Sequence, residues 1–173
     1  VRPLRLMGGR GWALVTGAAR RIGRQLALTA ARAGYDVVVH HHTSEADAQQ
    51  TAADIRALGG DATVAAADLA DAAACRRLIA TAPAPLTLLV NCASRFDDDR
   101  IERLTAEGWD AAFAANVRAP VLLAQAFAAL PDRDDAQIVN IVDLLVLKPT
   151  PQFFSYAVSK SALWAATQML AQA

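Results

Sequence analysis

Short runs of β-branched and other apolar residues alternate along the chain with longer, alanine-rich amphipathic runs. The short runs predict strands at residues 12–15, 37–41, 63–67, 86–90 and 137–143. The longer runs predict helices at residues 21–33, 44–58, 71–80, 107–130 and 154–173, with a kink near Pro120 in the fourth. Such alternation is typical of an α/β domain of three layers, in which a doubly wound parallel sheet lies between helices. We therefore predict a single domain, residues 1–173, with residues 1–10 as an N-terminal extension.

The turn after the first predicted strand has the features of a phosphate-binding turn. Its sequence, VTGAARRIG, follows a strand and opens a helix, which is the context that such a turn requires. Gly17 permits a tight turn, and Gly23 permits close contact between helix and strand. The helix N-terminus would offer a phosphate free N–H groups and the positive end of the helix dipole. The alternative is a simple connection between strand and helix.

The second predicted strand ends in HHHTS, residues 40–44. An NAD-dependent enzyme usually has an acidic residue here, for the ribose 2′-hydroxyl. This chain has none, and Arg20 and Arg21 in the first turn are able to approach the same place. Histidine, hydroxyl and arginine groups suit a 2′-phosphate, so we expect NADPH rather than NADH. Three adjacent histidines also raise the alternative of a metal site, but neighbours on a strand point to opposite faces, and we expect no metal.

Tyr156 and Lys160 lie four residues apart on a predicted helix and so share one face. An ammonium group beside a phenol favours the phenolate and lowers its pKa, which suits a proton donor near neutral pH. A pair of surface side chains is the alternative reading of the same spacing.

The motifs occur in one order: the glycine turn, Asp68-Leu69 after the third strand, NCAS (residues 91–94) after the fourth, Asn116, and the Tyr156/Lys160 pair. In this order, and from Trp12 to the end of the chain, the sequence resembles the short-chain dehydrogenase/reductase family. The resemblance implies a Rossmann-like fold, an NAD(P) cofactor and hydride transfer. It also implies that family members continue past the last helix, so that the C-terminal part of the usual fold is missing here.

The resemblance further implies roles for individual residues. Tyr156 would be the catalytic acid, Lys160 would hold the ribose and tune Tyr156, and Asn116 would support a proton-relay water. Asp68 would meet the adenine, and Asn91 would lie at the nicotinamide side. The implied cofactor-binding set is Gly17, Arg20, Arg21, Ile22, Gly23, His41, His42, Thr43, Ser44, Asp68, Leu69, Asn91, Ala93, Ser94 and Lys160.

Two departures from the family pattern resemble its pteridine reductase branch. Arg21 stands where the family usually has glycine, and Asp143, thirteen residues before Tyr156, stands where it has a catalytic serine. In that branch an aromatic residue after the Asn-x-Ala-Ser turn stacks on the pterin, which implies that role for Phe96, with Ser94 facing the cofactor. Cys92 and Thr43 differ from the branch, which usually has asparagine and often has arginine at these positions.

Asp143 changes which substrate the predicted site suits. A serine donates a hydrogen bond to a ketone oxygen, whereas an ionised aspartate only accepts. The carboxylate would also disfavour a nearby phenolate. It therefore suits a substrate edge rich in N–H donors, such as a 2-amino-4-oxo pyrimidine ring, or a proton relay to a ring nitrogen.

The hypothesis is an NADPH-dependent reductase of a C=N bond in a pterin- or folate-like ring, with a substrate site at Phe96, Ser94, Asp143 and Tyr156. Two alternatives for single residues are that Asp143 only caps the next turn and that Phe96 is ordinary core. Two alternatives for the whole chain are a carbonyl or 3-oxoacyl reductase of the same family, and an inactive dinucleotide-binding fragment.

Composition adds exclusions to this picture. With 17 basic and 17 acidic residues, the chain gives no general reason to expect nucleic acid or an anionic membrane as a partner. The two cysteines have no metal-ligand spacing, no apolar run predicts a membrane span, and the N-terminus lacks the apolar segment of a secretory signal. We expect a cytoplasmic protein that acts on a small molecule. The resemblance implies a homo-oligomer, a dimer or tetramer formed through helices 107–130 and 154–173.

Overall fold

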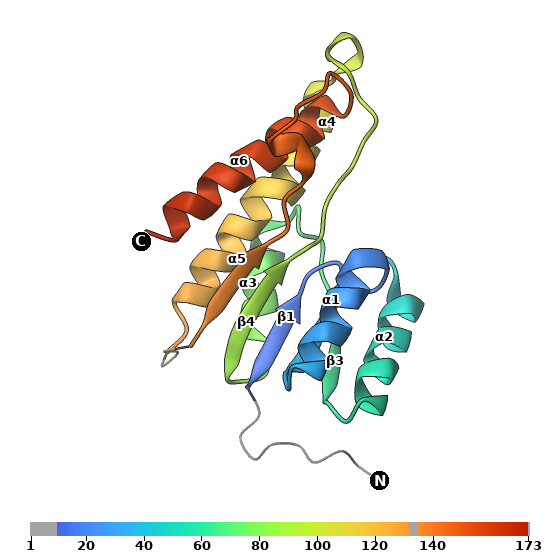
Figure 1. The fold of residues 1–173 in the computed structure, drawn as a ribbon, viewed down its shortest axis with the longest axis vertical. Helices are drawn as coiled ribbons and strands as arrows, with labels where there is room; N and C mark the ends of the chain where they lie inside the picture. Colours follow the sequence, from blue (N-terminus) through green and yellow to red (C-terminus); the bar gives the residue numbers. More distant parts are fainter. Residues whose placement is uncertain (1–9, 132–134, 173) are drawn as a thin grey trace.

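The computed structural model describes residues 10–131 and 135–172, so most of the expected N-terminal extension lies outside the described residues. Strands and helices alternate as predicted (Figure 1). The strands are β1 (Trp12–Val15), β2 (Asp36–His41), β3 (Ala62–Ala66), β4 (Leu86–Asn91) and β5 (Gln137–Asn140). The α-helices are α1 (Arg21–Arg32), α2 (Glu45–Ala57), α3 (Ala72–Ala80), α4 (Ala106–Phe113), α5 (Ala119–Ala128) and α6 (Phe154–Leu170).

All five strands are parallel and lie in the order β3-β2-β1-β4-β5. The chain winds outward from β1 to β3, then returns to the other side of β1 and continues to β5. The order therefore reverses between β1 and β4, and ligands of such sheets bind in the crevice beyond that point. This confirms the predicted doubly wound, Rossmann-like architecture.

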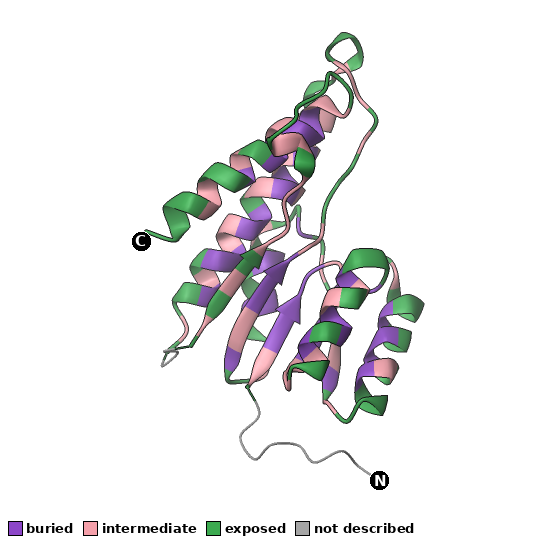
Figure 2. Cartoon of the chain, in the orientation of Figure 1, coloured by how far each residue is buried: buried purple, intermediate pink, exposed green. Residues whose placement is uncertain are grey.

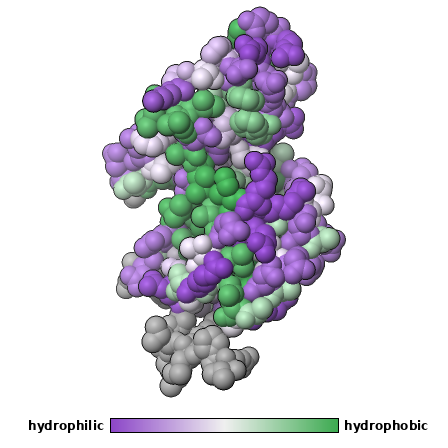
Figure 3. Space-filling model, turned by 45° about the vertical axis from the view of Figure 1, so that its right-hand side comes forward, coloured by the Kyte–Doolittle hydropathy of each residue, from purple (hydrophilic) through white to green (hydrophobic). Residues whose placement is uncertain are grey.

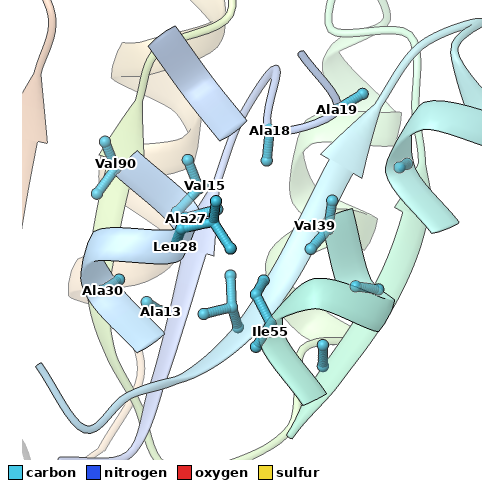
Figure 4. Close-up of a cluster of buried hydrophobic side chains, with 14 residues drawn as sticks. Ala13, Val15, Ala18, Ala19, Ala27, Leu28, Ala30, Val39, Ile55 and Val90 are labelled. Carbon is cyan, nitrogen blue, oxygen red and sulfur yellow. The ribbon is translucent and has the colours of Figure 1, made fainter. Parts of the chain in front are cut away.

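The pleat of the sheet divides the core into two clusters, one on each face. Ala13, Val15, Val37 and Val39 face α1 and α2 and pack with small side chains and Ile55 (Figure 4). Their neighbours along the strands, such as Leu14, Val38 and Leu89, face the opposite way and pack against α3 and against Leu123 and Phe127 of α5. Figure 2 shows this burial concentrated in the central strands and the inner sides of the helices. Burying both faces explains why the strands are continuous apolar runs rather than alternating ones.

The predicted long helix 107–130 is helical throughout residues 106–128, but a π-helical turn, Ala114–Arg118, separates α4 from α5. Pro120 is not the break itself, because it lies in the first turn of α5, where its missing N–H is tolerated. Ala106–Ala128 is long and apolar enough to cross a membrane by length and composition alone. Its apolar side packs instead on α3, β4 and α6 in this fold.

The predicted last strand, residues 137–143, was too long at its C-terminal end. Pairing with β4 stops at Asn140, because β4 itself ends at the opposite residue, Asn91. Asp143 lies beyond the sheet and begins a short 3₁₀ helix, Leu144–Val146.

Substituting Gly23 is expected to be more damaging than substituting a glycine that has only backbone strain. A Cβ at Gly23 would lie 2.1 Å from the Gly17 carbonyl oxygen, a backbone atom that cannot move without opening the turn. Gly23→Ala should lower the free energy of unfolding by about 3 kcal/mol or more, measured by urea denaturation. Gly34→Ala is the control, since its φ is +95° but nothing lies within 4 Å of the added Cβ. Equal losses in the two variants would contradict the steric explanation.

Candidate active site

The first turn packs directly against the turn that follows β4. Gly17 has φ +67°, and a Cβ there would lie 2.9 Å from Cα of Ala93. The hydroxyl oxygen of Thr16 accepts hydrogen bonds from the N–H groups of Cys92 (2.9 Å) and Ala93 (3.0 Å). Thr16 therefore fixes the two turns at the switch point of the sheet, a role that the sequence analysis missed. Its position directly after a buried strand is the signal that was available.

His40 joins three strand ends, and sequence reasoning also missed this role. The Gly17 N–H donates to Nδ1 of His40 (3.1 Å), and Nε2 lies 3.1 Å from the Ala67 carbonyl oxygen. The carbonyl of His40 also accepts the Ala18 N–H (2.9 Å). Burial lowers the pKa of His40 to about 4, so the ring is neutral at physiological pH, with its proton on Nε2. Both ring nitrogens are thus engaged within the protein, which argues against a metal ligand.

The N-terminus of α1 has the features expected of an anion site. Its N-cap residue, Arg20, makes no side-chain capping bond, and its first turn has no acidic residue. By contrast, α3 and α4 are capped by the side chains of Asp71 and Thr105. The first-turn N–H groups of α1 are therefore left without a side-chain acceptor among the described residues.

Basic and apolar side chains surround this helix end. Arg20 is exposed and lies 3.5 Å from Asp47 of α2. Arg21 adopts a left-handed backbone with φ 51°, which explains why glycine is the usual residue of the family at this position. Ile22 is 61% exposed, beside the predicted phosphate position.

The residues after β2 that were predicted to contact a 2′-phosphate differ in how far they are exposed. His42 and Thr43 are exposed and Ser44 is half-buried at the start of α2, so these three are accessible to a ligand. His41 is only 5% exposed, and its Nδ1 has no hydrogen-bond partner among the described residues.

The two residues predicted after the third strand behave differently. The Asp68 side chain is exposed and accepts the Ala70 N–H (2.8 Å), so it shapes its own turn at the edge where an adenine is expected. Leu69 is buried in the core cluster on the α3 side.

Asn91 ends β4 and starts a chain of side-chain amides under the site. Its Nδ2 donates to Oδ1 of Asn140 on β5 (2.8 Å), and Asn140 donates in turn to the Thr167 hydroxyl of α6 (2.9 Å). Oδ1 of Asn91 is buried without a hydrogen-bond partner among the described residues. Asn91 therefore serves the packing of β4, β5 and α6.

Asp143 and Tyr156 are in direct contact, as their spacing suggested. The Tyr156 hydroxyl donates to Oδ2 of Asp143 (2.9 Å), and Oδ1 accepts the Leu145 N–H (2.9 Å). Asp143 thus caps the 3₁₀ helix and also reaches the tyrosine, so capping is not its only contact. Its role toward a substrate stays a prediction.

The expectation that Tyr156 has a lowered pKa was wrong. Burial, the hydrogen bond to Asp143 and the charge of that carboxylate all raise the pKa of Tyr156. Nζ of Lys160 lies 5.7 Å from the centre of the tyrosine ring and donates to the Ile141 carbonyl (2.8 Å) rather than to the phenol. Burial lowers the pKa of Lys160 itself. The phenol is therefore held in its protonated form at neutral pH.

Asn116 lies fully buried in the π-helical turn and holds the backbone of the loop after β4. Its Oδ1 accepts the Arg95 N–H (2.8 Å) and the Ser94 hydroxyl (3.2 Å), while its Nδ2 contacts the Arg95 carbonyl and the Ser159 hydroxyl, both at 2.9 Å. Ser159 donates to the Tyr156 carbonyl (2.7 Å). Asn116 thereby links the β4 loop to α6 at the level of the tyrosine.

Phe96 is 55% exposed and lies against the tyrosine, so the alternative that it is ordinary core was wrong. Its ring meets Tyr156 edge-on at 4.6 Å between centroids and stacks on Phe153 at 4.5 Å. Other exposed apolar side chains follow Asp143, namely Leu144 and Leu147. Figure 3 shows apolar residues gathered across the middle of one face, between two more hydrophilic ends.

The predicted residues thus fall into two groups. One group borders the ends of β1, β2 and β3 and consists of the glycine turn, the histidine loop and Asp68. The other group lies beyond β4 and β5 and consists of Asp143, Tyr156, Lys160 and Phe96. Thr16 and the Ala93 turn connect the groups at the switch point. An extended molecule with phosphates at one end and a reactive ring at the other matches this layout.

Comparisons with known proteins identify the class. The family model for short chain dehydrogenases matches residues 11–173, and the chain belongs to this family. A short-chain type dehydrogenase/reductase from Picea abies is 34% identical, with 96% of this chain and 65% of that protein covered. A 3-oxoacyl-[acyl-carrier-protein] reductase from Synechocystis is 31% identical, with 92% of this chain and 66% of that protein covered. The chain spans about two thirds of the length of these relatives.

Solved structures agree with this assignment. FolM alternative dihydrofolate reductase 1 from Brucella canis, crystallised with NADP, is 42% identical, with a TM-score of 0.88 over 95% of this chain and 66% of that one. A short chain dehydrogenase from Burkholderia cenocepacia, also with NADP, is 37% identical, with a TM-score of 0.89 over 98% of this chain and 69% of that one. The resemblance to the pteridine-reductase-like branch is thus supported by a neighbour of that branch.

The buried, neutral His40 predicts a dependence of stability on pH. The unfolded chain takes up a proton on this histidine near pH 6.5, whereas the folded protein does so only near pH 4. The free energy of unfolding should therefore fall between those values, by about 3 kcal/mol at most from this group. Urea denaturation at pH 7 and at pH 5 measures the loss.

His40→Leu should be less stable than wild type at pH 7 and should lose less between pH 7 and pH 5. Val39→Ala is the control, because it removes buried volume from the same strand without removing a titratable group, so it should be less stable but keep the pH dependence. The same pH dependence in His40→Leu and wild type would contradict the assignment.

Proposed function

We propose that this chain is the NADPH-binding and catalytic part of a reductase that reduces a C=N bond in a pterin- or folate-like ring. The observation that carries the proposal is the hydrogen bond between Tyr156 and Asp143. Asp143 stands at the position where other family members have a serine. Both the proton donor and an ionisable acceptor are thereby present at one point of the site.

NADPH fits the first group of residues. The uncapped N-terminus of α1 suits the pyrophosphate, with Gly17 and Gly23 allowing the tight turn that presents it. The exposed arginines 20 and 21, together with His42, Thr43 and Ser44, suit a 2′-phosphate, and the loop contains no carboxylate that would repel one. The NADP in the neighbouring crystal structures supports this choice. When bound, the cofactor would supply a hydride to the ring carbon.

The residues of this chain would supply the proton and the orientation. The Tyr156 hydroxyl would give its proton to the ring nitrogen, but its raised pKa makes it a weak acid, so it would need to regain a proton in the same step. The free lone pairs of Asp143 would accept hydrogen bonds from ring N–H groups or pass a proton from solvent to the tyrosine. Lys160, buried beside the tyrosine, would contact the ribose.

The charge of Asp143 disfavours a plain ketone. A ketone oxygen polarised for hydride attack gains negative charge, and a carboxylate next to it opposes that change. A ring edge with amino and ring N–H groups instead gains from the same carboxylate. The FolM neighbour, described as an alternative dihydrofolate reductase, supports a substrate of this class.

Phe96 would stack on one face of the ring. Phe153 stacks on one face of the Phe96 ring in this structure, and the side chain is still 55% exposed. Aromatic stacking of this kind favours a flat heterocycle over an aliphatic ketone.

The second candidate is reduction of a carbonyl, as in the 3-oxoacyl reductase relative.

We also propose a homo-oligomer formed through α4, α5 and α6, since Trp164 and Met169 on α6 are exposed apolar side chains. Cytoplasmic location is part of the same proposal.

Substrate tests separate the candidates. NADPH oxidation should be measured with dihydropterin, dihydrofolate, simple ketones and a 3-oxoacyl thioester. We expect turnover of the two ring substrates and little of the others. Turnover confined to ketones or thioesters would refute the pterin proposal, and NADPH binding without any turnover would favour an inactive dinucleotide-binding chain.

Asp143 variants test the role of the carboxylate. Asp143→Ser should lower kcat for the ring substrate by about 100-fold or more, because both the acceptor and the proton relay are lost. NADPH affinity, measured by fluorescence titration, should be unchanged. Asp143→Asn is the matched control for shape, since it keeps the size of the side chain but loses its charge, and it should be almost as slow. Equal losses of turnover and NADPH binding in Asp143→Ser would show that the residue is structural.

A further inference from the structure

The helix that carries Tyr156 begins without a cap of its own. Phe153 occupies the N-cap position of α6 with φ 56°, makes no side-chain capping bond, and is followed by no acidic residue in the first turn. A bulky residue in the left-handed region is unfavourable unless its surroundings hold it there. The start of α6 therefore depends on contacts from elsewhere in the fold.

Those contacts come from Asp99, far away in the sequence. The Asp99 carboxylate accepts the Ser155 N–H with both oxygens, at 3.1 and 3.3 Å, and the Asp99 carbonyl accepts the Phe154 N–H at 3.3 Å. Asp99 thus satisfies the first two N–H groups of α6 and places a negative charge at the positive end of its dipole. Figure 1 shows the segment after β4 and the start of α6 beyond the carboxyl edge of the sheet.

The same loop carries Phe96, and it is held at both ends. At one end Asn116 holds both backbone polar groups of Arg95, and at the other end Asp99 holds α6. Between these points Phe96 stacks on Phe153 and meets Tyr156 edge-on. Loop and helix are therefore joined by the Asp99 hydrogen bonds and by the aromatic contacts.

We propose that Asp99 is a positioning residue that fixes the loop of Phe96 to the first turn of α6 and so sets where Tyr156 lies relative to the substrate ring. This role rests on the proposed function, because it concerns the geometry of that same site. Asp99 does not touch the reacting atoms. Without its carboxylate, the Ser155 N–H loses its acceptor in a part-buried place, and only the backbone bond from the Phe154 N–H still joins the loop to the helix. The first turn of α6, which includes Tyr156, then loosens.

The neighbouring acidic residue offers a matched control. Asp98 is exposed, and its side chain makes no hydrogen bond or ion pair with the described residues. Asp98→Ala removes the same charge from the same loop without removing the cap. Asp99→Asn keeps one carbonyl oxygen that can accept the Ser155 N–H.

The first measurement is the steady-state rate with a dihydropterin, at a temperature where every variant is folded. Asp99→Ala should lower kcat about tenfold or more with NADPH affinity unchanged, because a small displacement of the proton donor is costly. Asp99→Asn should recover most of the rate, and Asp98→Ala should match wild type. An unchanged kcat in Asp99→Ala, or an equal loss in Asp98→Ala, would overturn the proposal.

The second measurement is amide hydrogen exchange over residues 153–157, which does not depend on activity. Exchange should be faster in Asp99→Ala and unchanged in Asp98→Ala. Should the wild type reduce none of the substrates, the proposed function fails, and exchange alone decides this inference. Unchanged exchange in Asp99→Ala would then overturn it.

Discussion

The carboxyl edge of the parallel sheet is the constraint on which the rest of the structure depends. Helices bury both faces of the central strands, so polar side chains that follow these strands meet a ligand at this edge. The reversal of strand order at β1 and β4 opens the edge at one place. Thr16 and His40 fix the turns there by side-chain bonds to backbone N–H groups. Binding of an extended nucleotide follows from that fixed edge.

The proton chemistry follows from a second feature of the same edge, the pairing of Tyr156 with Asp143. In water a carboxylate and a phenol would each be hydrated, and their contact would count for little. Partial burial changes this, because it raises the pKa of the phenol and makes its hydrogen bond to Asp143 part of the fold. The phenol is thereby kept protonated, and a proton transfer from it would need a replacement proton through Asp143 to avoid leaving a phenolate beside the carboxylate.

The sequence predicted the order and type of the main strands and helices, because buried parallel strands and amphipathic helices leave strong periodic signals. It was less accurate where pairing partners decide the outcome, as at β5, whose length is set by the end of β4 at Asn91. The direct contact of Asp143 with Tyr156 agreed with their spacing. The pKa of Tyr156 did not follow from spacing, since it depends on burial and on where Lys160 directs its ammonium group. His40 was missed for a related reason: its two hydrogen bonds join residues 23 and 27 positions away.

Asp99 shows why such positioning residues are the hardest to find from a sequence. Nothing in FDDDR, residues 96–100, distinguishes the third aspartate from the second, because both are polar residues in a loop. Only the fold brings Asp99 to the N–H groups of Phe154 and Ser155 and leaves Asp98 exposed. Asn116 acts in the same way from the π-helical turn, with bonds to the backbone of Arg95 and to Ser159. The reacting residues are therefore held by side chains that make hydrogen bonds to backbone groups far away in the sequence. The positions of the reacting atoms are set by the fold rather than by the motif.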